Sequence, residues 1–131
     1  MIGLDTNVVV RYIVQDDPLQ SPQATRLIES LSAESPGFIT MVSVIELVWV
    51  LQGCYRATRA ELVEVLETLL RTRELVVERA EAVLRALRAF AHSNADFADC
   101  LIERCARDAG CDDVMTFDRD AAKTAGMRVI N

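Results

Sequence analysis

The sequence lacks several patterns on which common enzyme classes depend. His92 is the only histidine, and no Ser-His-Asp or Cys-His arrangement is present, so nucleophilic catalysis by a side chain has little support. The four cysteines include no CxxC pair, which argues against a zinc site with closely spaced ligands. We expect these thiols to be reduced and mostly buried.

Long apolar runs, targeting segments, repeats and linkers are also missing. No apolar stretch approaches the roughly 18 residues that would span a bilayer. The first residues show no basic segment followed by a short apolar one, as a signal peptide would. We therefore expect no membrane association and a cytoplasmic protein. The hydrophobic content of 51% is sufficient for the core of a single domain covering residues 1–131.

Basic residues are fewer than acidic ones. The 14 Lys and Arg face 20 Asp and Glu, and the formal net charge is -6. This charge argues against tight, charge-driven binding of nucleic acid, although an enzyme whose site carries cations is not excluded. Half of the basic residues lie between positions 56 and 88. They form either a local basic face or a solvated helix surface paired with neighbouring glutamates.

Short apolar strands alternate with helices along the whole chain. Strands are predicted at residues 1–5, 37–40, 74–78, 113–117 and 127–131. Helices are predicted at 8–15, 21–33, 42–55, 58–71, 79–91, 95–110 and 119–126. This alternation is typical of an α/β fold, and we expect a three-layer α/β/α sandwich with a mostly parallel central sheet.

Residues that favour helix starts mark several of these boundaries. Thr6 or Asn7 is expected to cap the first helix, Ser21 the second, and Ser93 or Asn94 the helix at 95–110. Thr58 and Glu61 have the spacing of a capping box. The helix at 42–55 is apolar nearly all round, which predicts that it is buried.

Acidic residues stand where a parallel α/β sheet binds its ligands. Asp5 ends the first strand, which we expect to be buried, and Asp118 follows the strand at 113–117. Glu46 lies near the start of the apolar helix, and Asp96 and Asp99 share one helix face. Since ligands bind beyond the carboxyl ends of such strands, we expect these carboxylates to converge.

Each acid also has an interpretation that involves no chemistry. Asp5 could be a helix cap, Asp118 a turn residue, Asp96 a helix N-terminal charge, and Glu46 a buried acid held by Thr40 or Ser43. Together, however, they lack enough nearby Lys or His to neutralise them. Hard cations such as Mg²⁺ or Mn²⁺ prefer carboxylate oxygens and can activate water against a phosphodiester.

The same stretches resemble a known family. "LDTNVVV", "VSVIELVWVL", "NADFADCLIERCARDAGCDDVMTFDRDA" and "GMRVI" are similar, in this order, to the PIN-domain ribonucleases, and most of all to the VapC-type toxins of toxin-antitoxin pairs. The resemblance implies an acidic pocket that binds Mg²⁺ or Mn²⁺ and cleaves single-stranded or looped RNA, often transfer or ribosomal RNA.

The resemblance also assigns residues. Asp5, Glu46, Asp99 and Asp118 match the four acids of the family, and Asp96 is an added acid that could also reach the metal. Supporting positions after the first acid and before the fourth are matched by Thr6, Asn7 and Thr116; we expect Asn7 and Thr116 to orient carboxylates or water.

Family members commonly form homodimers and are inhibited by a VapB-like antitoxin. A groove lined by the helices at 21–34 and 42–54 would suit an amphipathic antitoxin tail, and an Arg from that tail could pair with the acids.

Other functions remain open from the sequence. The same fold could serve as a catalytically inactive PIN-like binding module, although the set of four acids is complete. A receiver-like phosphoacceptor also clusters acids at strand ends, but the expected acidic pair before the first helix is absent. A phosphatase with an aspartyl nucleophile would have a second Asp at the position of Asn7.

Overall fold

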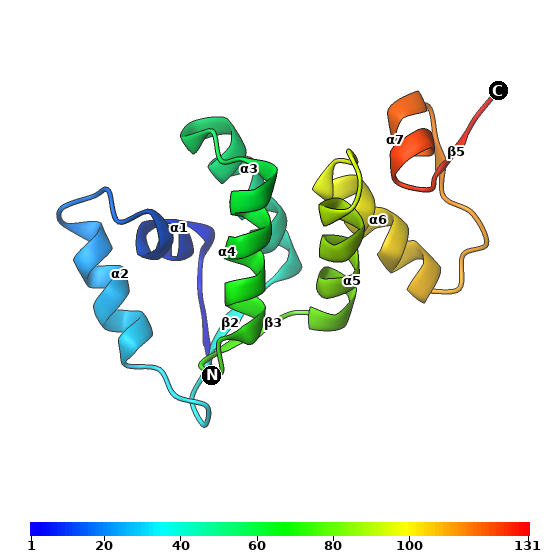
Figure 1. The fold of residues 1–131 in the computed structure, drawn as a ribbon. Helices are drawn as coiled ribbons and strands as arrows, with labels where there is room; N and C mark the ends of the chain where they lie inside the picture. Colours follow the sequence, from blue (N-terminus) through cyan, green and yellow to red (C-terminus); the bar gives the residue numbers. More distant parts are fainter. The chain divides into compact units, whose positions relative to one another are not determined.

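The computed structural model describes residues 1–131 and divides the chain into two compact units, Met1–Ala80 and Glu81–Asn131 (Figure 1). Each unit contains a parallel sheet and is described by itself. The alternation of strands and helices confirms the α/β class, with the strands divided between two sheets. None of the helices has the length and apolar character needed to span a bilayer. The single domain expected over residues 1–131 stays a prediction.

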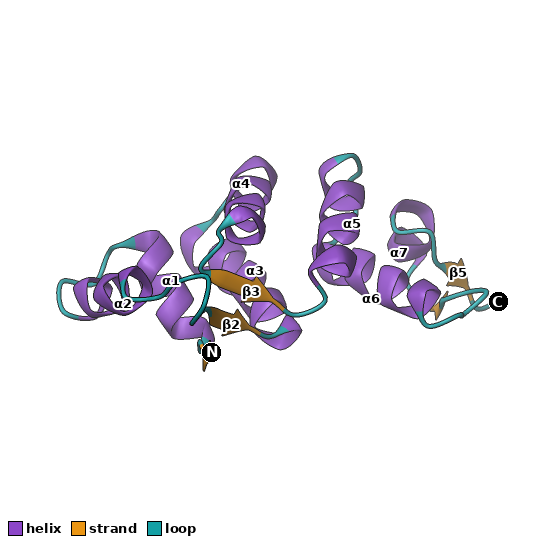
Figure 2. Ribbon diagram, turned by 90° about the horizontal axis from the view of Figure 1, so that it is seen from below, coloured by secondary structure: helices purple, strands orange, loops and turns teal.

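The sheet of the first unit contains β1 (Ile2–Gly3), β2 (Gly37–Ile39) and β3 (Leu75–Val77). Its order is β1-β2-β3, and both pairs are parallel. Figure 2 shows β2 and β3 side by side. The strands lie where the sequence predicted them, and their carboxyl ends meet at one edge because they run in the same direction.

The expectation that the first strand is buried is wrong. Ile2 is 49% exposed and Gly3 is exposed, whereas Leu4 is buried. In its sheet β1 pairs only with β2 and therefore lies at an edge. Asp5, which follows, is exposed as well, so its charge does not bear the cost of burial.

Four helices complete the first unit: α1 (Thr6–Val14), α2 (Gln20–Glu29), α3 (Met41–Tyr55) and α4 (Arg59–Arg71). The helix α1 packs against α2 and α3, and α4 packs against β3. Their apolar faces and β2 contribute to the core, which includes Val9, Ile39, Val44, Leu47, Leu62 and Leu66.

Only one face of α3 is buried, although its sequence is apolar nearly all round. Ser43, Val44 and Leu47 are buried, whereas Val42 is 68% and Trp49 60% exposed. The expectation that the whole helix is buried is therefore wrong. An apolar composition predicts burial only where a neighbouring element covers each side of the helix.

Two of the expected helix caps in the first unit are displaced. Asp5 is the N-cap of α1, and Thr6 is already helical and buried. Ser21 is buried inside the first turn of α2, and the carboxylate of Asp17 accepts hydrogen bonds from the N–H groups that begin this helix. The capping box of Thr58 and Glu61 at the start of α4 is confirmed.

The second unit contains α5 (Ala80–Ala91), α6 (Phe97–Asp108), β4 (Met115–Thr116), α7 (Arg119–Thr124) and β5 (Arg128–Val129). The strands β4 and β5 pair in parallel. Phe90 on α5 meets Phe97 on α6 edge to face, with ring centroids 5.8 Å apart. Gly110, with φ +98°, follows the end of α6, as expected for a helix stop.

The start of α6 and the exposure of the cysteines differ from expectation. The helix begins after Asp96, its N-cap, rather than after Ser93 or Asn94. Ala95 and Phe97 are each 1% exposed, and packing of these residues places the helix start. The expectation of mostly buried thiols is also wrong, since Cys100 is buried but Cys54 and Cys111 are exposed.

Candidate active site

Asp5 stands at the point where β1 passes into α1. Its backbone is extended, with φ -71° and ψ 155°, and its Oδ1 accepts a hydrogen bond from the N–H of Thr6 at 2.9 Å. The carboxylate thereby caps the positive end of the helix. A carboxylate has about four acceptor positions, so this bond leaves Asp5 free to bind another group.

Thr6 connects Asp5 to α3. Its hydroxyl lies 2.6 Å from Oε1 of Glu46 and 3.1 Å from the hydroxyl of Ser43. Thr6 has one hydroxyl proton, and the carboxylate can only accept, so Thr6 donates to Glu46 and accepts the proton of Ser43. Thr6 and Ser43 are 6% and 8% exposed. Glu46 itself is exposed, so it is not the buried acid that the sequence also allowed. The partly buried chain of hydrogen bonds fixes Glu46 relative to Thr6, the residue that follows Asp5.

The second unit carries three of the predicted carboxylates at the starts of α6 and α7. Asp96 caps α6 by accepting from the N–H of Asp99 at 3.2 Å, and Asp99 lies in the first turn. Burial raises the pKa of Asp99 above its ordinary value, and the negative charges of Asp96 and Asp118 raise it further. A cation close to Asp99 would offset these effects and favour its ionised form.

Asp118 occupies the loop between β4 and α7. It is the N-cap of α7, where Oδ1 accepts from the N–H groups of Asp120 at 2.8 Å and of Ala121 at 3.4 Å. The hydroxyl of Thr116 accepts from the N–H of Asp118 at 3.0 Å. Thr116 therefore shapes the turn that carries Asp118, rather than contacting its carboxylate.

The structure thus places the predicted residues in two groups. The first unit joins Asp5, Thr6 and Glu46, and the second joins Asp96, Asp99 and Asp118. Glu46 bonds to Thr6 instead of to Thr40 or Ser43, the partners considered from the sequence.

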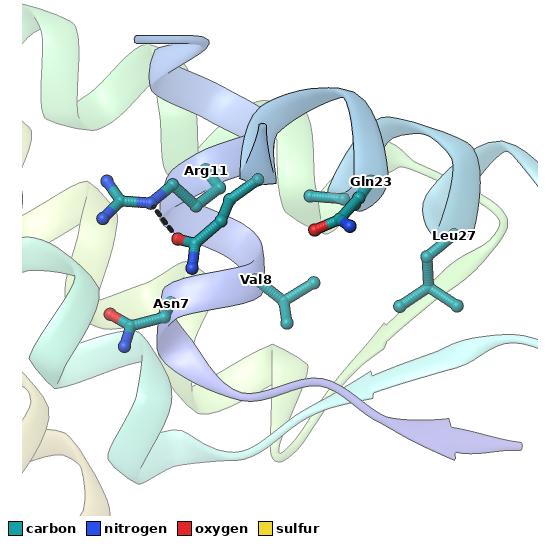
Figure 3. Close-up of a pocket in the computed structure, with 7 residues that line it drawn as sticks. Asn7, Val8, Arg11, Gln23 and Leu27 are labelled. Carbon is teal, nitrogen blue, oxygen red and sulfur yellow. Dashed lines mark hydrogen bonds between the residues drawn. The ribbon is translucent and has the colours of Figure 1, made fainter. Parts of the chain in front are cut away.

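Asn7 points elsewhere. It is exposed and, with Val8 and Arg11 of α1, faces Gln23 and Leu27 of α2 across a pocket of about 270 Å³ (Figure 3). It forms no hydrogen bond with the acids.

Sequence reasoning missed two polar residues of the first unit. Ser43 was considered only as a partner for Glu46, yet it donates to Thr6. Glu78 follows β3, and its carboxylate accepts from the N–H of Met41 at 2.8 Å, at the start of α3. Its position after a strand, at the carboxyl edge of a parallel sheet, was the signal that could have found it.

The donors fit a hard divalent cation by their chemistry. They are carboxylates, and Asp96, Asp99 and Asp118 form no ion pair with any Lys, Arg or His. Burial, followed by the charges of Asp96 and Asp118, raises the pKa of Asp99. No three His, Cys, Asp or Glu side chains are arranged so that together they could hold a metal ion. The metal prediction therefore rests on donor chemistry.

Comparison with known proteins agrees with the resemblance seen in the sequence. The family model described as PIN domain matches residues 2–127. A VapC ribonuclease from Aquifex aeolicus (strain VF5) is 27% identical over 129 residues, which cover 98% of this chain and 94% of that protein. These findings confirm the predicted resemblance and the PIN-like α/β fold class. The chain belongs to the PIN domain family.

Proposed function

We propose that the protein is a metal-dependent endoribonuclease that acts as the toxin of a toxin-antitoxin pair. The observation that carries the proposal is the group Asp96, Asp99 and Asp118, in which burial and then the charges of Asp96 and Asp118 raise the pKa of Asp99, so that a cation would be favoured there. The PIN domain match and the similarity to a VapC ribonuclease support hydrolysis of RNA as the activity that uses it.

The proposed roles follow from the side chains. Asp5, Glu46, Asp99 and Asp118 are the catalytic carboxylates and, with Asp96, would hold Mg²⁺ or Mn²⁺. A bound cation of this kind lowers the pKa of water and stabilises the oxygen that leaves phosphorus.

Neighbouring polar groups would keep these carboxylates in place. Thr6 would orient Glu46 through the 2.6 Å hydrogen bond, and Thr116 would fix the turn at Asp118. Asn7 is exposed and forms no hydrogen bond with the acids, and it is proposed to orient water.

The substrate class follows from charge and family. Because the net charge is -6, we propose that binding depends on local arginines and on the shape of a single-stranded or looped segment. Arg56, Arg71 and Arg73 are exposed and form no ion pair within 4.0 Å. Transfer or ribosomal RNA in the cytoplasm is the proposed target.

The proposed inhibitor is a VapB-like antitoxin. The pocket between α1 and α2 is lined by Asn7, Val8, Arg11, Gln20, Gln23, Ala24 and Leu27, a mixture that suits an amphipathic tail. We propose this pocket in place of the groove expected between the helices at 21–34 and 42–54; α1 supplies one of its walls. Asn7 lies two residues from Asp5, so an Arg of the tail could reach that carboxylate. A homodimer is also proposed, by analogy with the family.

The experiment is an RNA cleavage assay. Purified protein is incubated with total cellular RNA in the presence of Mn²⁺ or EDTA, and new RNA ends are mapped by sequencing. Asp5→Asn is the test variant, because Asn also caps helices and preserves the fold. Asp112→Asn, at an exposed loop position, is the matched control.

Discrete cuts that require Mn²⁺ and Asp5 but not Asp112 would establish the enzyme and identify its target. Cuts that persist in Asp5→Asn would contradict the site. No cuts by folded protein free of inhibitor would favour the alternative, a catalytically inactive PIN-like binding module.

A further inference from the structure

The carboxyl edge of the three-stranded sheet carries an acid that none of the roles above uses. The register pairs Gly3 with Phe38 and Ile39 with Val77. Continued past the strand ends, it places Asp5, Thr40 and Glu78 at the same level on neighbouring strands. The hydrogen bonds from Leu4 N–H to Phe38 O and from Glu78 N–H to Ile39 O, at 2.9 Å and 2.8 Å, support this continuation.

These three residues all contact the start of a helix, but Glu78 differs in which helix it contacts. Asp5 caps α1, which follows its own strand, and Thr40 caps α3 in the same way, accepting from the N–H of Ser43 at 3.1 Å. Glu78 reaches from β3 to α3 and accepts from the N–H of Met41 at 2.8 Å. It thereby ties two elements that are distant in the sequence.

The first N–H groups of a helix have no acceptor one turn earlier in the helix, and Met41 is the first residue of α3. Thr40 supplies an acceptor for Ser43, and Glu78 supplies one for Met41. A carboxylate at this position also interacts favourably with the positive end of the helix. Both partners hold the first turn of α3.

The backbone after Glu78 supports a fixed role for it. Arg79 has φ +50°, in the left-handed region that non-glycine residues rarely adopt. This conformation turns the chain directly after Glu78 and ends β3, so the side chain of Glu78 lies at the sheet edge instead of continuing the strand.

We propose that Glu78 is a positioning residue of the nuclease site. It holds the first turn of α3, and this turn carries Ser43, whose hydroxyl donates to Thr6. Thr6 in turn donates to Glu46, one turn further along α3. Loss of the Glu78 bond releases this turn and misplaces the carboxylate of Glu46. The inference rests on the proposed function.

The test compares Glu78→Ala, Glu78→Gln and a control, Glu74→Ala. Gln keeps a carbonyl oxygen that can accept from Met41, whereas Ala does not. Glu74 precedes the same strand at its opposite end, and its side chain forms no hydrogen bond with α3. The kcat and KM for RNA cleavage are measured for all three variants, and thermal unfolding verifies that each is folded.

We expect Glu78→Ala to lower kcat by about tenfold or more with KM within about twofold, because misplaced catalytic groups weaken the transition state more than binding. Glu78→Gln should restore most of kcat, and Glu74→Ala should match wild type. Unchanged kcat in Glu78→Ala would overturn the proposal. Equal loss in Glu78→Ala and Glu78→Gln would overturn it too, since the charge rather than the hydrogen bond would then be required.

A second measurement separates this inference from the proposed function. The backbone amide signal of Met41 in a ¹H–¹⁵N spectrum should shift in Glu78→Ala and stay in place in Glu74→Ala. If the wild-type protein does not cleave RNA but the Met41 signal still shifts in Glu78→Ala, then Glu78 holds α3 and the nuclease assignment fails. An unmoved Met41 signal would overturn the positioning role whatever the activity.

Discussion

Three of the acids combine a structural task with the proposed chemical one. Asp5, Asp96 and Asp118 are N-caps of α1, α6 and α7. From the sequence, a cap and a metal ligand are competing interpretations of these residues. In the structure they are compatible, because a cap uses part of the acceptor capacity of a carboxylate and fixes its orientation. Helix capping is therefore no argument against function here.

Substitution of Thr6 tests how far activity depends on the position of Glu46, because it changes no charged side chain. Thr6→Val keeps the size of the side chain but deprives Glu46 and Ser43 of their partner. We expect the free energy of unfolding to fall by about 1–3 kcal/mol, the cost of leaving the buried hydroxyl of Ser43 unpaired. RNA cleavage should fall with it, whereas Thr6→Ser should retain both. Urea unfolding and cleavage rates check this, and a fully active Thr6→Val would remove Thr6 from the site.

Asp99 predicts a dependence of stability on pH. Its pKa is raised in the folded state, chiefly by burial and then by Asp96 and Asp118. A carboxyl group whose pKa is raised by folding stabilises the folded protein at pH values below the pKa that the group has in the unfolded chain. This contribution is lost as the pH rises through the pKa of the group in the folded protein.

Without metal, Asp99→Asn should therefore gain stability relative to wild type as the pH rises through this interval towards 7. Urea unfolding of both proteins in EDTA, from acidic to neutral pH, measures the difference. A difference that stays constant with pH would show that the charge of Asp99 is not penalised in the fold.

Element positions could be predicted from the sequence better than element starts. Each predicted strand and helix is found, because the apolar periodicity is strong. The starts of α1 and α6 were misplaced where several capping residues follow one another, as in Asp5-Thr6-Asn7. In these cases tertiary contacts determine where the helix begins. Thr6 is helical and bonds to Glu46, and the burial of Phe97 fixes the start of α6.

The candidate site was predictable only in part for the same reason. Asp5, Asp96, Asp99 and Asp118 stand at helix starts after strands or loops, where local sequence reveals them. The bonds of Thr6 with Ser43 and of Glu78 with Met41 join residues that are 37 positions apart. No periodicity or local motif indicates such pairs, and they depend on how α3 packs at the sheet edge.

The capping box at the start of α4 allows the contribution of one helix cap to the free energy of unfolding to be measured. Thr58 accepts from the N–H of Glu61 at 3.2 Å, and Glu61 accepts from the N–H of Thr58 at 2.8 Å. Thr58→Ala removes one of these bonds and should lower the free energy of unfolding by about 1 kcal/mol. Thr58→Ser should preserve it. Thermal or urea unfolding measures both, and equal losses in the two variants would show that the hydroxyl is not the stabilising group.

At the scale of the whole molecule, the acidic excess and the PIN domain match lead to the same expectation. A net charge of -6 makes the folded chain repel itself, and the acids of the proposed site add local repulsion. A cation bound by those acids would relieve it. Binding to the folded state alone stabilises by RT ln(1 + [L]/Kd), about 2.7 kcal/mol at 100 times Kd.

Millimolar Mg²⁺ or Mn²⁺ should therefore raise the melting temperature of the wild-type protein. Divalent cations also screen charge over the whole surface, so the comparison is made against NaCl at equal ionic strength. Asp99→Asn should lose most of the metal-dependent rise, because it removes a proposed ligand, whereas Asp112→Asn should keep it. Equal rises in both variants would assign the effect to general screening and leave the acids without a metal.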